Sequence, residues 1–132
     1  MPIGVKEIVL GIPVAKSGGM AEYDKAIEWY VDVLGFELEW KMGIASLKLA
    51  SGQHILLFGE DEDESSIWYT GDIHRNPHFS IQFVTEDIEM LRAELIASGV
   101  RVGEIIPGGG GGKDMMFYDP HGNRFWAIED PK

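Results

Sequence analysis

The sequence predicts an α+β fold made of two successive βαβββ modules, and three observations lead to this prediction. Alternating apolar residues mark short strands, and apolar residues three and four positions apart mark two helices. These elements follow the same order in both halves of the chain, and Gly52–Gly59 aligns residue by residue with Gly122–Glu129. We therefore interpret residues 1–132 as a single domain that contains a duplicated unit.

The first module, about residues 1–59, begins with a β-branched, apolar run from Glu7 to Val14 that predicts a strand. A helix follows, with its apolar positions at helical spacing and Gly35 at its C-terminus, where a residue without Cβ is favoured. The apolar positions of this helix are Tyr23, Ile27, Tyr30 and Leu34. Three further strands are predicted over Phe36–Lys41, Ile44–Leu49 and His54–Phe58.

A polar stretch, about residues 60–77, separates the modules and opens with the five consecutive acids at 60–64. A block of like charges usually forms a solvated linker. The apolar residues Ile67, Trp68 and Tyr69 interrupt this stretch, so part of it is expected to pack on the neighbouring core or on a partner subunit.

The second module, about residues 78–132, repeats the pattern. A strand is predicted over His78–Val84, and Thr85 is the expected N-cap of the second helix, which Gly99 ends. Three more strands are predicted over Val100–Ile106, Lys113–Tyr118 and Arg124–Glu129. Between the last two, Asp119-Pro120 and Gly122-Asn123 predict a tight turn.

The composition limits the function classes. A formal charge of −11 argues against nucleic acids and anionic membranes as partners, since both need a basic face, and it favours solubility or a cationic ligand. The sequence contains no run long enough to span a membrane and no signal peptide, and we expect a cytoplasmic protein. With no cysteine, disulfides and thiol chemistry are excluded.

Glu7 and His78 stand at the starts of two strands that the duplication makes equivalent, and Glu129 at the end of the last strand is a third polar residue that could join them. An imidazole and two carboxylates form a plausible divalent-metal site, with open positions for water and substrate. Each residue also has an ordinary structural explanation. Glu7 and Glu129 are then exposed at strand ends, and His78 is a hydrogen-bonded strand residue.

Other motifs are less specific. The glycine run 108–112 lacks the Gly-Lys-Ser/Thr of a phosphate loop, so it is either a lid over a pocket or a flexible connection. His121 is expected in the turn. His54 is expected on the face of its strand opposite Ile55 and Leu57.

Three segments together resemble the vicinal oxygen chelate superfamily of glyoxalases, bleomycin-resistance proteins and extradiol dioxygenases. They are Ala26–Phe36, which ends in Leu-Gly-Phe, His78 at a strand start, and Tyr118–Asn123 with the strand to Glu129. The resemblance implies two βαβββ modules whose sheets curl around a shared cup, and usually a homodimer. It also implies metal ligands at Glu7, His78 and Glu129. A further carboxylate of glyoxalase-like members falls on Gly59, and Glu7 stands where the family usually has His, so this is no close glyoxalase I equivalent.

Two functions follow from the resemblance. The first is a metal-dependent lyase, isomerase or dioxygenase that acts on a small molecule with vicinal oxygens. It would use Mn, Fe, Ni, Zn or Mg, with Glu129 as the candidate catalytic residue. The alternative is a metal-free binding protein of the bleomycin-resistance type, which holds a cationic or planar aromatic ligand.

Overall fold

The computed structural model describes residues 3–14, 19–42, 44–59, 70–72, 76–78, 81–107 and 112–129. The chain divides into two compact units, Met1–Asp63 and Glu64–Lys132. Within the described residues, each unit contains one helix and one four-stranded sheet, and the second also contains a separate two-stranded sheet. The two sheets and their helices confirm the predicted α+β fold.

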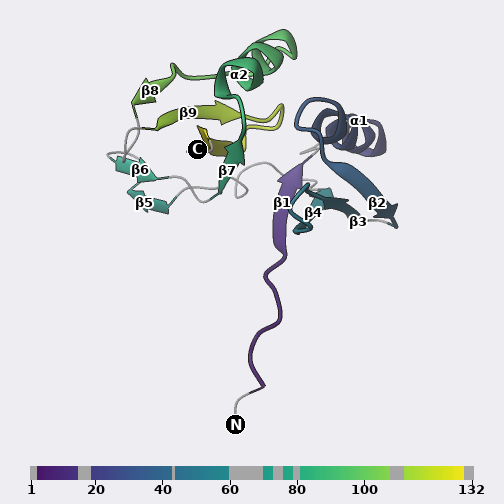
Figure 1. Cartoon of the computed structure of the whole chain (residues 1–132). Helices are drawn as coiled ribbons and strands as arrows, with labels where there is room; N and C mark the ends of the chain where they lie inside the picture. The colour runs from purple at the N-terminus through teal and green to yellow at the C-terminus, as the bar shows by residue number, and fades with distance from the viewer. Residues whose placement is uncertain are drawn as a thin grey trace. The chain divides into compact units, whose positions relative to one another are not determined.

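The first unit contains a sheet with the strand order β1-β4-β3-β2 (Figure 1). Its elements are β1 (Leu10–Val14), α1 (Gly19–Asp32), β2 (Glu37–Lys41), β3 (Ile44–Lys48) and β4 (His54–Gly59). β1 and β4 are parallel, as a crossover through α1 requires, whereas β3 is antiparallel to both of its neighbours. β1 and β2 are therefore the edge strands of this sheet.

The helix α1 packs on the face of this sheet where the buried residues of β4 lie. Ile55 and Leu57 are almost completely buried, and His54, Leu56 and Phe58 alternate with them at intermediate exposure. The Tyr23 hydroxyl of α1 donates a hydrogen bond to the Leu57 carbonyl oxygen at 2.6 Å, which ties the helix to the strand. His54 is therefore on the face that α1 does not cover, as predicted.

The second unit has a sheet with the strand order β7-β10-β9-β8. Its elements are β7 (Gln82–Thr85), α2 (Ile88–Ala97), β8 (Ile106–Pro107), β9 (Lys113–Tyr118) and β10 (Arg124–Glu129). The ring centroids of Phe83, Phe117 and Phe125 are 5.2–6.2 Å apart, and these rings form the centre of its core. α2 packs against β9 and β10 and buries Ile88 and Leu95.

The predicted turn between β9 and β10 is organised by the side chain of Asp119. Its Oδ1 accepts hydrogen bonds from the backbone amides of His121 and Asn123, and its Oδ2 accepts one from Asn123 Nδ2. Gly122 has a φ of 87°, which a residue with a Cβ rarely adopts. Asp119 and Asn123 are buried, so this polar turn is part of the folded core.

Several predicted boundaries were wrong. β1 begins at Leu10, so Glu7 precedes the strand. In place of one strand over His78–Val84, His78 ends β6 (Asn76–His78) and β7 begins at Gln82. β6 pairs with β5 (Thr70–Asp72), and both strands begin inside the stretch predicted to be a linker.

The second helix and the strand after it also differ from the prediction. The N-cap of α2 is Asp87, whose side chain accepts from the Met90 amide, because the helix starts two residues later than a Thr85 cap would place it. The strand predicted over Val100–Ile106 is reduced to a bridge at Val102 and to β8. The acids 60–64, Ile67–Tyr69 and residues 108–111 lie outside the described residues.

Candidate functional site

Glu129, the proposed metal ligand and catalytic residue, lies on the helix side of its sheet. Phe125 and Ala127 are fully buried under α2, and Glu129 follows them on the same face because side chains alternate along β10. Its Oε2 accepts a hydrogen bond from the Ile88 amide at 3.1 Å, and Ile88 is the first residue of α2. Since helix N-termini leave amides unpaired and carry partial positive charge, the carboxylate has a structural partner.

The other two proposed ligands have different surroundings. Glu7 lies before β1 in the first unit, where its Oε2 is 4.0 Å from His54 Nδ1. His78 is the last residue of β6 in the second unit, and its side chain lies outside what the structure describes. Among the described residues, no three His, Asp or Glu side chains converge to hold a metal ion.

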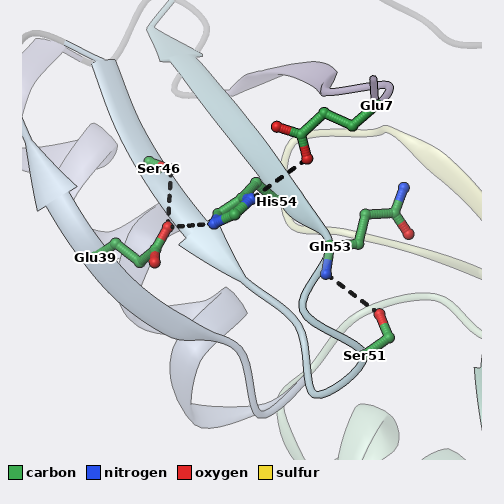
Figure 2. A network of polar contacts seen from close by, with 6 residues as sticks. All are labelled: Glu7, Glu39, Ser46, Ser51, Gln53 and His54. Carbon is green, nitrogen blue, oxygen red and sulfur yellow. Dashed lines mark hydrogen bonds and ion pairs between the residues drawn. The ribbon is translucent and has the colours of Figure 1, made fainter. Parts of the chain in front are cut away.

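The structure reveals a polar network on the first unit that the sequence did not indicate (Figure 2). His54 of β4 stands between two carboxylates, with Glu39 Oε1 2.9 Å from its Nε2 and Glu7 on its Nδ1 side. The Ser46 hydroxyl on β3 also reaches Glu39 Oε1, at 3.4 Å. The two carboxylates lie beside opposite nitrogens of the imidazole ring. They therefore do not converge beside one ring nitrogen, as they would have to do to bind the same metal ion.

An irregularity in β2 explains why Glu39 takes part in this network. Leu38 pairs with Leu47, but the next pair along the strands is Trp40 with Ser46, so Glu39 is an extra residue in a β-bulge. Paired residues in an antiparallel sheet share a face. The bulge therefore directs Trp40 to the open face of Ser46 and His54, and it directs Lys41 to the helix side.

The contacts of Lys41 support its position on the helix side of the sheet. Its ammonium group forms an ion pair with Asp24 of α1 and lies 5.8 Å from the centroid of the Tyr23 ring. In a regular ladder Trp40 would occupy that helix-side position. The bulge thus exchanges an aromatic for a charged residue under α1 and exposes the indole, whose relative exposure is 50%.

The open face of the first sheet also carries apolar surface. Leu56 and Phe58 of β4 lie there at intermediate exposure, next to Gly11 on β1. A Cβ placed on Gly11 would lie 2.5 Å from the Phe58 ring, so the absence of a side chain lets the ring lie across β1. The result is a face with two aromatic rings, Trp40 and Phe58, beside the carboxylate–imidazole network.

Sequence patterns contained part of this arrangement. Alternation along Arg124–Glu129 indicates that Glu129 shares a face with Phe125 and Ala127, which was the signal for its position under α2. Alternation likewise separated His54 from the core. No comparable pattern marks the bulge, so neither the role of Glu39 nor the exposure of Trp40 was predicted.

Comparisons with known proteins bear on the whole chain. Residues 20–127 match the family model of the Glyoxalase/Bleomycin resistance protein/Dioxygenase superfamily. The crystal structure of SMU.1112c is similar, with a TM-score of 0.69, 27% identity, and coverage of 96% of this chain and 100% of that one. No curated protein sequence matches the chain at a significant level.

Two further solved structures with this fold are titled as a lyase and as a bleomycin resistance determinant. Lactoylglutathione lyase from Agrobacterium tumefaciens has a TM-score of 0.63 and 18% identity, with coverage of 97% of this chain and 96% of that one. The bleomycin resistance determinant encoded on transposon Tn5 has a TM-score of 0.65 and 16% identity, with coverage of 97% and 100%. Together with the two βαβββ-type units described above, the family match shows that this chain belongs to the Glyoxalase/Bleomycin resistance protein/Dioxygenase superfamily.

Proposed function

We propose that this chain is a small-molecule-binding protein of the bleomycin-resistance kind, which holds a planar, positively charged ligand without a metal. The observation that carries the proposal is the open face of the first sheet, where Trp40 and Glu39 lie side by side because of the β2 bulge. An indole face attracts a flat cation, and an adjacent carboxylate adds direct charge pairing. The chain's formal charge of −11 favours the approach of such a ligand.

The comparisons support this class of function at the level of the fold. A structure titled as an antibiotic binding protein, TnmS3 from Streptomyces sp. CB03234, has a TM-score of 0.68 and 18% identity. The Tn5 determinant is named for bleomycin resistance. Since a lactoylglutathione lyase has the same fold, the choice between binding and catalysis rests on the residues of this chain.

Ethidium, a planar aromatic cation, is a suitable probe for the proposed face. We expect it to quench tryptophan fluorescence on binding, and we expect an uncharged phenanthridine with the same rings to bind at least several-fold more weakly. Glu39→Gln and Trp40→Ala should each weaken ethidium binding by about 3- to 10-fold, or about 0.6–1.4 kcal/mol. Glu28→Gln is the matched control, because it removes an exposed carboxylate from α1 in the same unit. Equal binding by wild type and both variants would overturn the proposal.

The second candidate is a metal-dependent enzyme with Glu7, His78 and Glu129 as ligands and Glu129 also as a proton carrier. Within the described part of the chain the donor set does not fit, because Glu129 pairs with the α2 N-terminus and Glu7 faces His54. The discriminating measurement is the metal content of the purified protein, compared with His78→Ala and Glu129→Gln. Stoichiometric metal that both variants lose would establish this candidate over the binding protein. A metal-free wild type that gains no thermal stability from Mn, Fe, Ni, Zn or Mg would eliminate it.

A further inference from the structure

Two carboxylates and one imidazole form a row across the open face of the first sheet. Glu39 of β2 lies on the Nε2 side of His54, and Glu7, which precedes β1, lies on the Nδ1 side (Figure 2). Among the described residues, His54 is the one ion-pair partner of either carboxylate. Since an imidazole carries at most one positive charge, the row stays negative as long as both carboxylates are ionised.

A lysine on the same face does not cancel this negative charge. Lys48 of β3 pairs with His54 of β4 on one side and with Glu37 of β2 on the other. Paired residues of antiparallel strands share a face, so Glu37 brings a further carboxylate to the position opposite Lys48. The face therefore keeps an excess of negative charge that suits a ligand with more than one positive group.

A hollow adjoins the Glu7 end of the row. It has a volume of about 580 Å³ and is lined by Val5, Glu7 and Ile8 before β1 and by Ser51 and Gln53 of the turn before β4. The backbone amide of Gln53 donates a hydrogen bond to Ser51 Oγ at 3.4 Å within this turn (Figure 2). The two apolar side chains suit methylene groups, and the carboxylate of Glu7 suits a cation.

We propose that the ligand of this face is an aromatic dication. Its planar cation lies on Trp40 and Glu39, and a second positive group, on a short alkyl linker, lies in the hollow beside Glu7. This inference rests on the proposed function, because it adds a second contact to the ligand of the same face. Since the imidazole of His54 keeps the two carboxylates apart, each carboxylate meets a different positive group of the ligand. The second contact distinguishes a dication from a monocation with the same rings.

The first test compares ethidium with propidium, which carries the same rings and a quaternary ammonium group on a propyl linker. We expect wild type to bind propidium about 3- to 5-fold more tightly, as a partly exposed ion pair allows. Glu7→Gln should remove this preference and leave ethidium binding unchanged. Glu28→Gln removes the same charge from an exposed position of α1 and should keep the preference. Isothermal titration calorimetry at low salt measures all the affinities.

The outcomes of this test separate the inference from the proposed function. If ethidium binds but propidium binds no more tightly, the dication inference fails and the proposed face stands. The same conclusion follows if Glu7→Gln retains the full preference for propidium. If neither dye binds wild type, the inference and the proposed function fail together.

A second variant tests the hollow itself. Gln53 is exposed, and its hydrogen bond to Ser51 uses the backbone amide, so a change of its side chain leaves that bond in place. Gln53→Arg puts a guanidinium group in the hollow beside Glu7 and should abolish the preference for propidium. Met20→Arg adds the same charge at an exposed residue of α1 and should leave the preference at its wild-type value. If Gln53→Arg, with an unchanged far-UV spectrum, keeps the full preference, the second group does not lie in the hollow and the proposal fails.

Discussion

The two units join the last strand of the sheet to the helix in different ways. In the first unit β4 ends at Gly59, whose position for a Cβ is 3.5 Å from the Tyr23 ring, and the Tyr23 hydroxyl bonds to the strand. In the second unit β10 ends at Glu129, whose carboxylate accepts from the first amide of α2. Aligned strand ends thus use aromatic packing in one unit and a charge at a helix terminus in the other. Glu129, which has no acidic counterpart at Gly59, therefore binds the N-terminus of α2. Its place at the end of a strand does not by itself reveal this structural role.

The largest effects are expected from substitutions in the cores of the two units. Phe117→Ala removes a buried ring that packs on both Phe83 and Phe125, and it should lower the free energy of unfolding by about 3–5 kcal/mol. Leu57→Ala in the core of the first unit should lower it by about 2–5 kcal/mol. Urea titrations followed by circular dichroism measure both. A loss below 1 kcal/mol for either variant would show that the core side chain is not packed as described.

An intermediate effect is expected at the close contact between β1 and Phe58. Gly11→Ala places a methyl group 2.5 Å from the ring, so the ring must move, at a cost of about 1–3 kcal/mol. Gly59→Ala is the matched control, since its methyl group would lie at 3.5 Å from Tyr23, an ordinary contact distance. Equal thermal stability of the two variants would contradict the position of the Phe58 ring.

Smaller effects distinguish the two strand–helix connections directly. Glu129→Ala and Tyr23→Phe should each lower the free energy of unfolding by about 1 kcal/mol, the first by losing a charge at a helix N-terminus and the second by losing a neutral hydrogen bond. Salt screens the first interaction and leaves the second largely unaffected. The loss for Glu129→Ala should therefore shrink at 1 M NaCl, whereas the loss for Tyr23→Phe should not. An unchanged loss for Glu129→Ala would argue against the helix-terminal role.

The smallest effect appears only in alkaline solution and belongs to the first unit. Burial raises the pKa of Tyr23 above its ordinary value, with a weaker contribution from the charge of Asp24. The unfolded chain releases this proton near pH 10, while the folded chain keeps it, so stability falls as the pH rises above about 10 and through the folded pKa. Tyr23→Phe should remove this part of the alkaline loss, which urea titrations at pH 9 and pH 11 measure. The same alkaline loss in both proteins would contradict the burial of the hydroxyl.

Short sequence patterns predicted much of the fold but less of the candidate site. The turn at Asp119–Asn123 and the glycines that end both helices were predicted correctly, because the required backbone conformations depend on few residues. Gly35 and Gly99 both adopt positive φ. The strand pair β5–β6 was missed because its residues are polar and show no alternation.

The site depended on relations between strands that a single strand does not encode. Glu39 meets His54 across three strands, and their approach requires both the β2–β3–β4 pairing and the bulge. The position of Glu129, by contrast, follows from alternation along its own strand. Sequence alone predicts which side of a strand a residue occupies more readily than which residue it meets there.

The bulge in β2 has a consequence for how this face can change during evolution. A residue inserted in the middle of a strand normally inverts the orientation of everything that follows, but here the strand ends soon afterwards, with Trp40 and Lys41. The part of the strand before the bulge keeps Leu38 opposite Leu47 whatever follows. The last two residues of β2 can therefore be replaced, or re-oriented by deletion of one residue, while the hydrophobic pairing behind them is preserved. A fold that serves many different small molecules gains from such a short, replaceable strand end beside a fixed one.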